Sequence, residues 1–169
     1  MSAASKRGVP HTPRARAGGG AAVSVRMTAH RASRPPARQL ARWADAALGR
    51  RARGARISVL LVGPGRSRTL NARYRDRDRP TNVLSFPATV EAQRHEGLLG
   101  DLVICPAVLA AEARAQGKGL AAHWAHLVVH GVLHLVGFDH EREQDAVRME
   151  RREIRVLRGL GFDNPYRMR

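Results

Sequence analysis

The stretch that most limits how this chain can fold is residues 120–136, where apolar side chains recur at helical spacing. This run is more apolar than the segments beside it, and a helix that is apolar on most of its sides is buried inside a domain. Gly137 follows directly and is expected to end the helix, because glycine readily adopts the left-handed conformation that turns a chain away from a helix axis. We therefore predict one central, buried helix around which the other elements pack.

Signals on both sides of this helix predict an α+β domain. Short apolar or β-branched runs bounded by turn residues predict strands near residues 22–27, 57–62, 81–86 and 98–105. Amphipathic spacing and helix-starting residues predict further helices over about 35–48, 67–74, 106–116 and 141–157. The expected fold is a small four-stranded mixed sheet with about five helices packed around the central helix.

One domain is expected over residues 21–162, with a disordered basic tail at 1–20 and a short C-terminal tail at 163–169. No apolar run approaches the roughly 20 residues needed to cross a bilayer, so no membrane partner is expected. The basic start also lacks the apolar core of a secretory signal. Because Cys105 is the one cysteine, no intramolecular disulfide can form, which fits a reducing cytoplasm.

The positive charge of the chain is concentrated in its first half. Residues 1–75 contain 17 lysines and arginines against the single acid Asp45, whereas residues 76–169 contain 13 basic and 13 acidic residues. A field of this sign attracts polyanions, so nucleic acid is the favoured partner and peptide or sugar substrates are disfavoured. The alternative is a compositional bias without a binding role, since 28 of the 30 basic residues are arginines.

Three histidines at and after the end of the central helix predict a metal site. His130 and His134 are four residues apart and therefore project from the same side of a helix, one turn from each other. The turn at Gly137 can bring His140 back toward them. Three protein ligands with an open fourth position are typical of catalytic zinc, which lowers the pKa of its water to about 7.

Two alternatives accompany this ligand set. His126 lies on the same helix face and could replace His140 as the third ligand, although a straight ladder of histidines spreads its nitrogens along roughly 12 Å of helix axis. The spacing also resembles that of zinc proteases, which need a glutamate directly after the first histidine as general base. Here that position is Gly131, so a protease is the less favoured hypothesis.

Three blocks of the sequence are distinctive in their order and separation. The histidine block is HLVVHGVLHLVGFDH at residues 126–140, and the other two are LNARYR at 70–75 with DRPTNVLSFP at 78–87, and LGDLVIC at 99–105. Together the three blocks resemble the YbeY endoribonuclease and rRNA maturation factor family. The resemblance spans about residues 22–160; it departs from the family at Gly63-Pro64-Gly65-Arg66 and in the tail before Gly20.

The resemblance implies one zinc ion on His130, His134 and His140, and an essential catalytic arginine at Arg75. It also implies a cytoplasmic, single-strand-specific endoribonuclease that acts on rRNA and the small ribosomal subunit, in maturation of the 16S rRNA 3′ end and in ribosome quality control. A guanidinium such as that of Arg75 can grip a phosphate with two hydrogen bonds. A second hypothesis is a ribosome assembly factor with little nuclease activity. The oligomeric state is left open.

Overall fold

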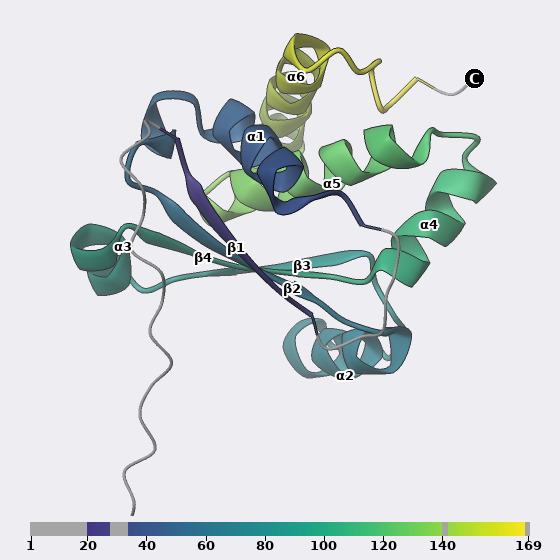
Figure 1. Ribbon diagram of the computed structural model, residues 1–169. Coiled ribbons are helices and arrows are strands. Elements are labelled where there is room, and N and C mark those ends of the chain that lie inside the picture. The colour runs from purple at the N-terminus through teal and green to yellow at the C-terminus, as the bar shows by residue number, and fades with distance from the viewer. Residues whose placement is uncertain (1–19, 28–33, 140–141, 168–169) are drawn as a thin grey trace, which may run out of the picture.

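The computed structural model describes residues 20–27, 34–139 and 142–167, which contain four strands and six α-helices (Figure 1). In chain order the elements are β1 (Ala22–Met27), α1 (Ala37–Leu48), a 3₁₀ helix (Gly49–Ala52), β2 (Arg56–Leu61), α2 (Pro64–Arg75), β3 (Val83–Pro87), α3 (Val90–Glu96), β4 (Leu98–Ile104), α4 (Pro106–Ala115), α5 (Leu120–Leu135) and α6 (Glu143–Gly159). The predicted α+β class is confirmed.

The four strands form one mixed sheet in the order β1-β2-β4-β3. β1 pairs in parallel with β2, and β2 pairs in parallel with β4, whereas β3 runs antiparallel to β4. The parallel pair β1 and β2 is connected through α1, as parallel strands require a crossover. β3 is thereby an edge strand, and it lies beside α5.

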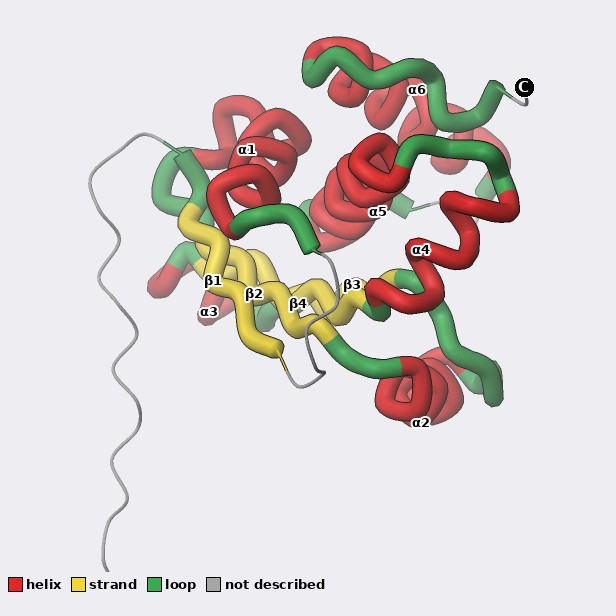
Figure 2. The backbone as a smooth tube through the Cα atoms, turned by 45° about the vertical axis from the view of Figure 1, so that its right-hand side comes forward, coloured by secondary structure: helices red, strands yellow, loops and turns green. Residues whose placement is uncertain are grey.

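The two faces of the sheet are covered unequally (Figure 2). α1 and α5 pack on one face and α6 packs outside α5, while α2 lies on the other side of the sheet. Alternating residues of β2 and β4 point into the larger core, as with Ile57, Val59 and Leu102. A smaller cluster around Val62, Leu84 and Val103 lies on the opposite face.

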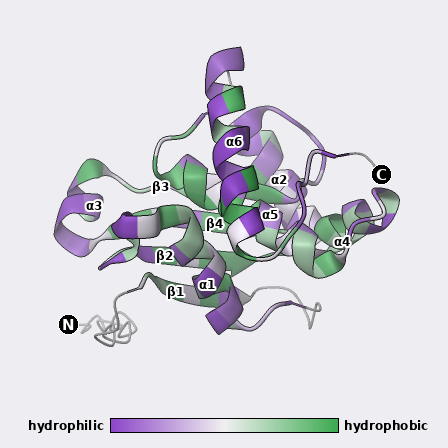
Figure 3. Ribbon diagram, turned by 90° about the horizontal axis from the view of Figure 1, so that it is seen from above, coloured by the Kyte–Doolittle hydropathy of each residue, from purple (hydrophilic) through white to green (hydrophobic). Residues whose placement is uncertain are grey.

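α5 is the buried central helix that the sequence predicts. Ten of its residues are buried, and it contacts α1, α4, α6, β3 and β4. α6 is different, because Figure 3 shows it as a largely hydrophilic helix with a few hydrophobic positions. The buried residues of α6 include Met149 and Leu157, which turn toward α5 and the core.

Two local features differ from the sequence prediction. α2 begins at Pro64, two residues beyond the end of β2, and Ser67 lies within the helix instead of capping it. The Ser67 hydroxyl donates to the Thr81 carbonyl at 2.8 Å and accepts from the Thr81 N–H at 2.9 Å, which holds the loop after α2. The polar connection before β4 contains α3, whose N-cap Thr89 accepts from the Ala92 N–H.

The predicted tail at residues 1–20 lies, apart from Gly20, outside the described residues. No helix in the described part of the chain is long and apolar enough to cross a membrane.

Candidate metal centre and cleft

α5 brings His130 and His134 together one turn apart near its C-terminal end. The Nε2 atoms of the two half-buried rings are 3.2 Å apart. Two nitrogen ligands of one tetrahedral zinc ion lie about 3.3 Å apart, because each Zn–N bond is about 2.0–2.1 Å long. The two nitrogens are therefore at hydrogen-bond distance from each other, and the same spacing is compatible with a shared metal ion.

The other ring nitrogen of His130 is hydrogen-bonded to a carboxylate. His130 Nδ1 lies 2.7 Å from Oε1 of Glu153, which comes from α6 and is completely buried. Burial acts to raise the pKa of Glu153, but the His126, His130 and Tyr166 side chains around the carboxylate lower it to about 2. A carboxylate oxygen accepts hydrogen bonds, so His130 Nδ1 is the protonated nitrogen and donates a hydrogen bond to Oε1 of Glu153.

His126 extends this network in the direction of the α5 N-terminus. Its Nε2 atom approaches Oε2 of Glu153 at 3.4 Å without forming a hydrogen bond. His126, His130 and Glu153 together make a cluster of one nitrogen or oxygen each, within 4.8 Å of one another, that could hold a metal ion. Glu153 contacts the His130 ring at Nδ1, whereas His134 contacts it at Nε2.

The turn after α5 has the geometry that the sequence predicts. Gly137 has a φ of 90°, and the Phe138 N–H donates to the Leu133 carbonyl at 3.0 Å, which reverses the chain. His140, the third ligand predicted from the sequence, lies outside the described residues. Asp139 precedes it and lines the cleft described next.

A cleft of about 810 Å³ connects the histidines to the last turn of α2. Arg75 lies on its wall, exposed, with Nη2 donating to the Ser85 carbonyl at 3.3 Å. Its neighbours in the cleft include polar and basic groups from three segments of the chain. They are Asn71, Arg77, Thr81, His130, His134 and Asp139. The structure thus places Arg75, His130 and His134 around one open space.

Ser85 and Gly131 connect the two walls of this cleft. The buried Ser85 hydroxyl donates to the Gly131 carbonyl at 3.2 Å, while the Ser85 carbonyl accepts from Arg75. A Cβ atom at Gly131 would lie 2.8 Å from Cδ2 of Leu102 and 3.2 Å from the Ser85 hydroxyl oxygen. Position 131 therefore packs against the sheet, and the proton-accepting glutamate of a protease has no space there.

Sequence reasoning missed Glu153 as a residue of the site. The available signal was its place on α6, four residues after buried Met149 and four before buried Leu157, which puts an acid on the apolar face of an amphipathic helix. Tyr166 was also missed, since the segment after residue 162 was predicted to be a tail. Its hydroxyl donates to Oε2 of Glu153.

A mixed α+β domain that presents paired imidazoles and a guanidinium to one cleft has the composition of a metal-dependent hydrolase. A profile of the endoribonuclease YbeY family matches residues 27–161. The chain belongs to this family of endoribonucleases, which hydrolyse phosphodiester bonds, and the resemblance seen in the sequence is confirmed.

Individual relatives agree with this assignment. Endoribonuclease YbeY of Alkalilimnicola ehrlichii is 51% identical over 146 residues, which cover 84% of this chain and 88% of the relative. Endoribonuclease YbeY of Methylococcus capsulatus is 53% identical over 125 residues, covering 74% and 82%. A Thermotoga maritima protein of known solution structure shares the fold, with a TM-score of 0.52 and 21% identity over 86% of this chain and 99% of that one.

Proposed function

We propose that this endoribonuclease cleaves single-stranded RNA with a zinc ion held by His130, His134 and His140, and with Arg75 as its phosphate-binding catalytic residue. We further propose that it works in the cytoplasm on rRNA of the small ribosomal subunit, at the 3′ end of 16S rRNA and in ribosome quality control. The observation that carries the proposal is the convergence of the two Nε2 atoms, 3.2 Å apart, on the cleft that Arg75 lines.

RNA must be able to reach the metal ion, and this requirement favours the histidine ligand set over the cluster of His126, His130 and Glu153. Glu153 is completely buried, so an ion beside it would have little room for an RNA phosphate. The Nε2 atoms of His130 and His134 belong to rings that line the cleft. When bound, zinc would supply Lewis acidity and lower the pKa of water to about 7.

Arg75 is suited to hold the phosphate that reacts. Its guanidinium is anchored through Nη2 by the Ser85 carbonyl and through Nη1 by the Tyr74 carbonyl, and a planar guanidinium has five N–H donors in all. The remaining donors can bind two oxygens of one phosphate and offset the charge that builds on them in the transition state.

The exposed arginines around the cleft provide a path for the flanking strand. Arg73, Arg77 and Arg79 are exposed on the last turn of α2 and the loop after it, and Arg77 lines the cleft with Arg75. Arginines that bind RNA phosphates release the counterions of the RNA, so this binding depends on salt concentration and not on base sequence. A single strand can also turn one backbone phosphate toward the histidines.

The test is cleavage of a labelled single-stranded RNA by zinc-quantified protein, with the same RNA as a duplex for comparison. We expect the single strand to be cut, and Arg75→Ala to lower kcat/KM by about 10²–10³-fold, because a charged donor to the transition state is lost. Arg66→Ala is the matched control: Arg66 is also an exposed arginine of α2 but does not line the cleft. Intact RNA after incubation with zinc-loaded protein would refute the nuclease assignment.

The ligand set is tested by zinc content in His130→Ala, His134→Ala and His140→Ala proteins. We expect each variant to lose zinc, whereas retention in the third would move the third ligand to His126. In cells, His134→Ala should leave immature 16S rRNA 3′ ends. Normal maturation in that strain would instead support the assembly-factor hypothesis.

A further inference from the structure

Glu153 is the one Asp, Glu, Lys or Arg side chain that is fully buried in the described part of the chain. Removing a carboxylate from water is costly unless hydrogen bonds and opposite charges replace its hydration. Here Oε1 accepts from His130 Nδ1, and Oε2 accepts from the Tyr166 hydroxyl and lies near His126 Nε2. Both carboxylate oxygens thus have partners, which hold the Glu153 side chain in one orientation.

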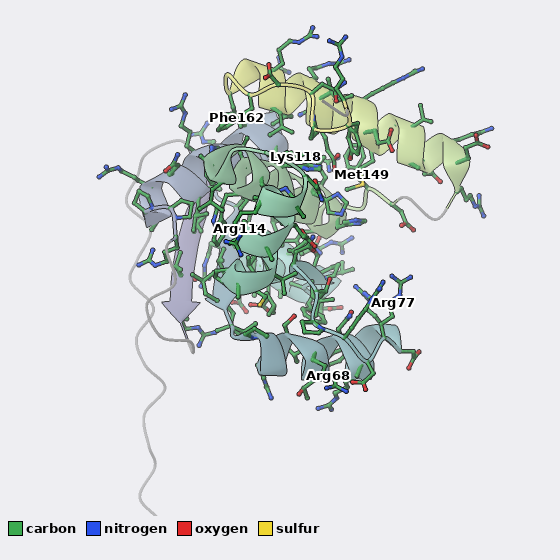
Figure 4. All side chains as sticks on the ribbon, turned by 90° about the vertical axis from the view of Figure 1, so that its right-hand side faces the viewer. Arg68, Arg77, Arg114, Lys118, Met149 and Phe162 are labelled. Carbon is green, nitrogen blue, oxygen red and sulfur yellow. The ribbon has the colours of Figure 1, made fainter. Side chains whose placement is uncertain are left out.

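The segment after α6 is built to deliver Tyr166 to this carboxylate. Gly161, with a φ of 86°, turns the chain away from α6, and the Phe162 ring packs edge-on against Trp43 at 6.2 Å between centroids. Figure 4 shows Phe162 and Met149 on the side of α6 that faces the rest of the domain. The Asn164 side-chain oxygen then accepts from the Tyr166 N–H at 3.0 Å, a local turn that orients the tyrosine.

Tyr166 is held at both its ring and its hydroxyl. The ring packs edge-on against His126, with 5.4 Å between centroids, and the hydroxyl donates to Glu153. Burial and the Glu153 carboxylate raise the pKa of the Tyr166 hydroxyl, which therefore stays protonated and can only be a donor toward the ionised acid. A chain of contacts consequently runs from the C-terminal segment through Glu153 to His130.

This chain of contacts determines which nitrogen of His130 faces the cleft. Because Nδ1 donates to Glu153, a neutral His130 ring keeps its lone pair on Nε2, the atom 3.2 Å from His134 Nε2. A carboxylate behind a ligating histidine sets the ring orientation and makes the ligand more basic. Without Glu153 the ring could rotate, or carry its proton on the nitrogen that the metal needs.

We propose that Glu153 and Tyr166 are positioning residues for the metal ligand His130: Tyr166 holds the Glu153 carboxylate, and Glu153 holds the Nδ1–H form of the His130 ring. This inference rests on the metal ligands given under the proposed function. It gives the C-terminal segment a role in metal binding through two residues that do not themselves touch the ion.

The experiment compares Glu153→Gln and Tyr166→Phe with two matched controls in the full chain. Glu112→Gln alters another carboxylate that pairs with a histidine of α5, since Glu112 Oε2 is 2.9 Å from His123 Nε2. Tyr74→Phe removes the hydroxyl of the other tyrosine, which lies on α2. The readouts are the zinc dissociation constant, measured by chelator competition, and the ¹⁵N shifts of the His130 ring in the metal-free protein.

We expect Glu153→Gln to weaken zinc binding by about 10–100-fold, the usual effect of losing a carboxylate behind a ligating histidine. Tyr166→Phe should weaken zinc binding in the same direction, and both variants should lower the population of the Nδ1–H form of His130. Both controls should retain zinc affinity within about twofold, since neither contacts a ligand. Circular dichroism checks the fold, and Tyr166→Phe keeps the test valid if Glu153→Gln does not fold.

Two results would overturn the inference, and they differ in whether the proposed zinc ligands are retained. Wild-type zinc affinity and ring shifts in both variants, with zinc still lost in His134→Ala, would refute the positioning role and leave the proposed ligands intact. Zinc retained in His134→Ala but lost in both His126→Ala and Glu153→Gln would make Glu153 a ligand, which also overturns the proposed ligand set.

Discussion

At the scale of single residues, Gly131 has a role that its place in the metal motif conceals. It lies between the two histidines on α5, where a Cβ atom would meet Leu102 and Ser85 of the sheet, and its carbonyl accepts from the Ser85 hydroxyl. Ser85 in turn holds Arg75. The missing side chain thus lets the helix that carries His130 and His134 pack against the strand whose Ser85 holds Arg75.

We expect Gly131→Ala to destabilise the fold by about 1 kcal/mol, because overpacking costs about 1–3 kcal/mol and alanine's helix propensity returns up to about 1. The new Cβ would meet Leu102, which is fully buried and has little room to move. Urea unfolding measures the change. Gly65→Ala on α2, where a Cβ would meet nothing within 4 Å, should be neutral or stabilising. Equal behaviour of the two variants would contradict this account.

His123 gives a second prediction, which concerns pH. Burial lowers the pKa of His123, although Glu112 acts to raise it and the charges of His126 and Lys118 lower it further. As the pH falls below the ordinary histidine pKa of about 6.5, His123 therefore becomes protonated in the unfolded chain before it does in the folded protein. The contribution of His123 to the free energy of unfolding is therefore present in full above about pH 6.5 and declines as the pH falls.

An NMR titration of the His123 ring checks this directly. We expect its midpoint below about 6.5, and lower still in Glu112→Gln, because that variant removes the group that raises the pKa. A midpoint above the ordinary value would show that the Glu112 carboxylate outweighs burial.

At the scale of elements, periodicity predicted the long helices and the strands because their apolar residues recur at the spacing that burial requires. The short α3 escaped prediction because none of its residues is buried, so it leaves no apolar stripe. The start of α2 was misplaced because Gly63-Pro64-Gly65 both ends β2 and opens the helix. The position of Glu153 on the apolar face of α6 could have marked it as buried, but its contacts with His130 and Tyr166 join separate segments of the chain and leave no sequence pattern.

The end of α5 provides a prediction at this scale. Gly137→Ala places a side chain at a φ of 90°, so we expect a loss of about 1–2 kcal/mol and weaker zinc binding, because the turn leads toward His140. Gly159→Ala is the matched control, as Gly159 ends α6 without a positive φ and with open space around it. Unchanged unfolding and zinc affinity in Gly137→Ala would argue against a strained turn.

At the scale of the whole molecule, charge and chemistry are divided along the chain. The first half carries the net positive charge and supplies Arg75, whereas the central helix and α6 supply the histidines and the buried carboxylate. The fold brings both halves to one cleft. On the function proposed above, the positive charge would affect how RNA binds, and the histidines would affect its cleavage.

A chain that begins at Gly20 separates these contributions. It lacks Lys6, Arg7, Arg14 and Arg16. For single strands, each phosphate that a basic residue neutralises adds about −0.7 to the slope of log K against log salt concentration. We expect the slope to become shallower by up to about 3, with zinc affinity unchanged. Fluorescence anisotropy at several salt concentrations measures it. An identical slope would show that these four residues do not contact RNA.

His130 and His134, the two zinc ligands proposed on α5, lie on the helix that fills the core, which has a consequence for how the sequence of this enzyme can change. Any substitution that loosens α5 against the sheet should also disturb the spacing of the two imidazoles, so thermal stability and zinc retention should change together. Directed evolution toward a hotter optimum should then enrich for tighter zinc retention without selecting for it.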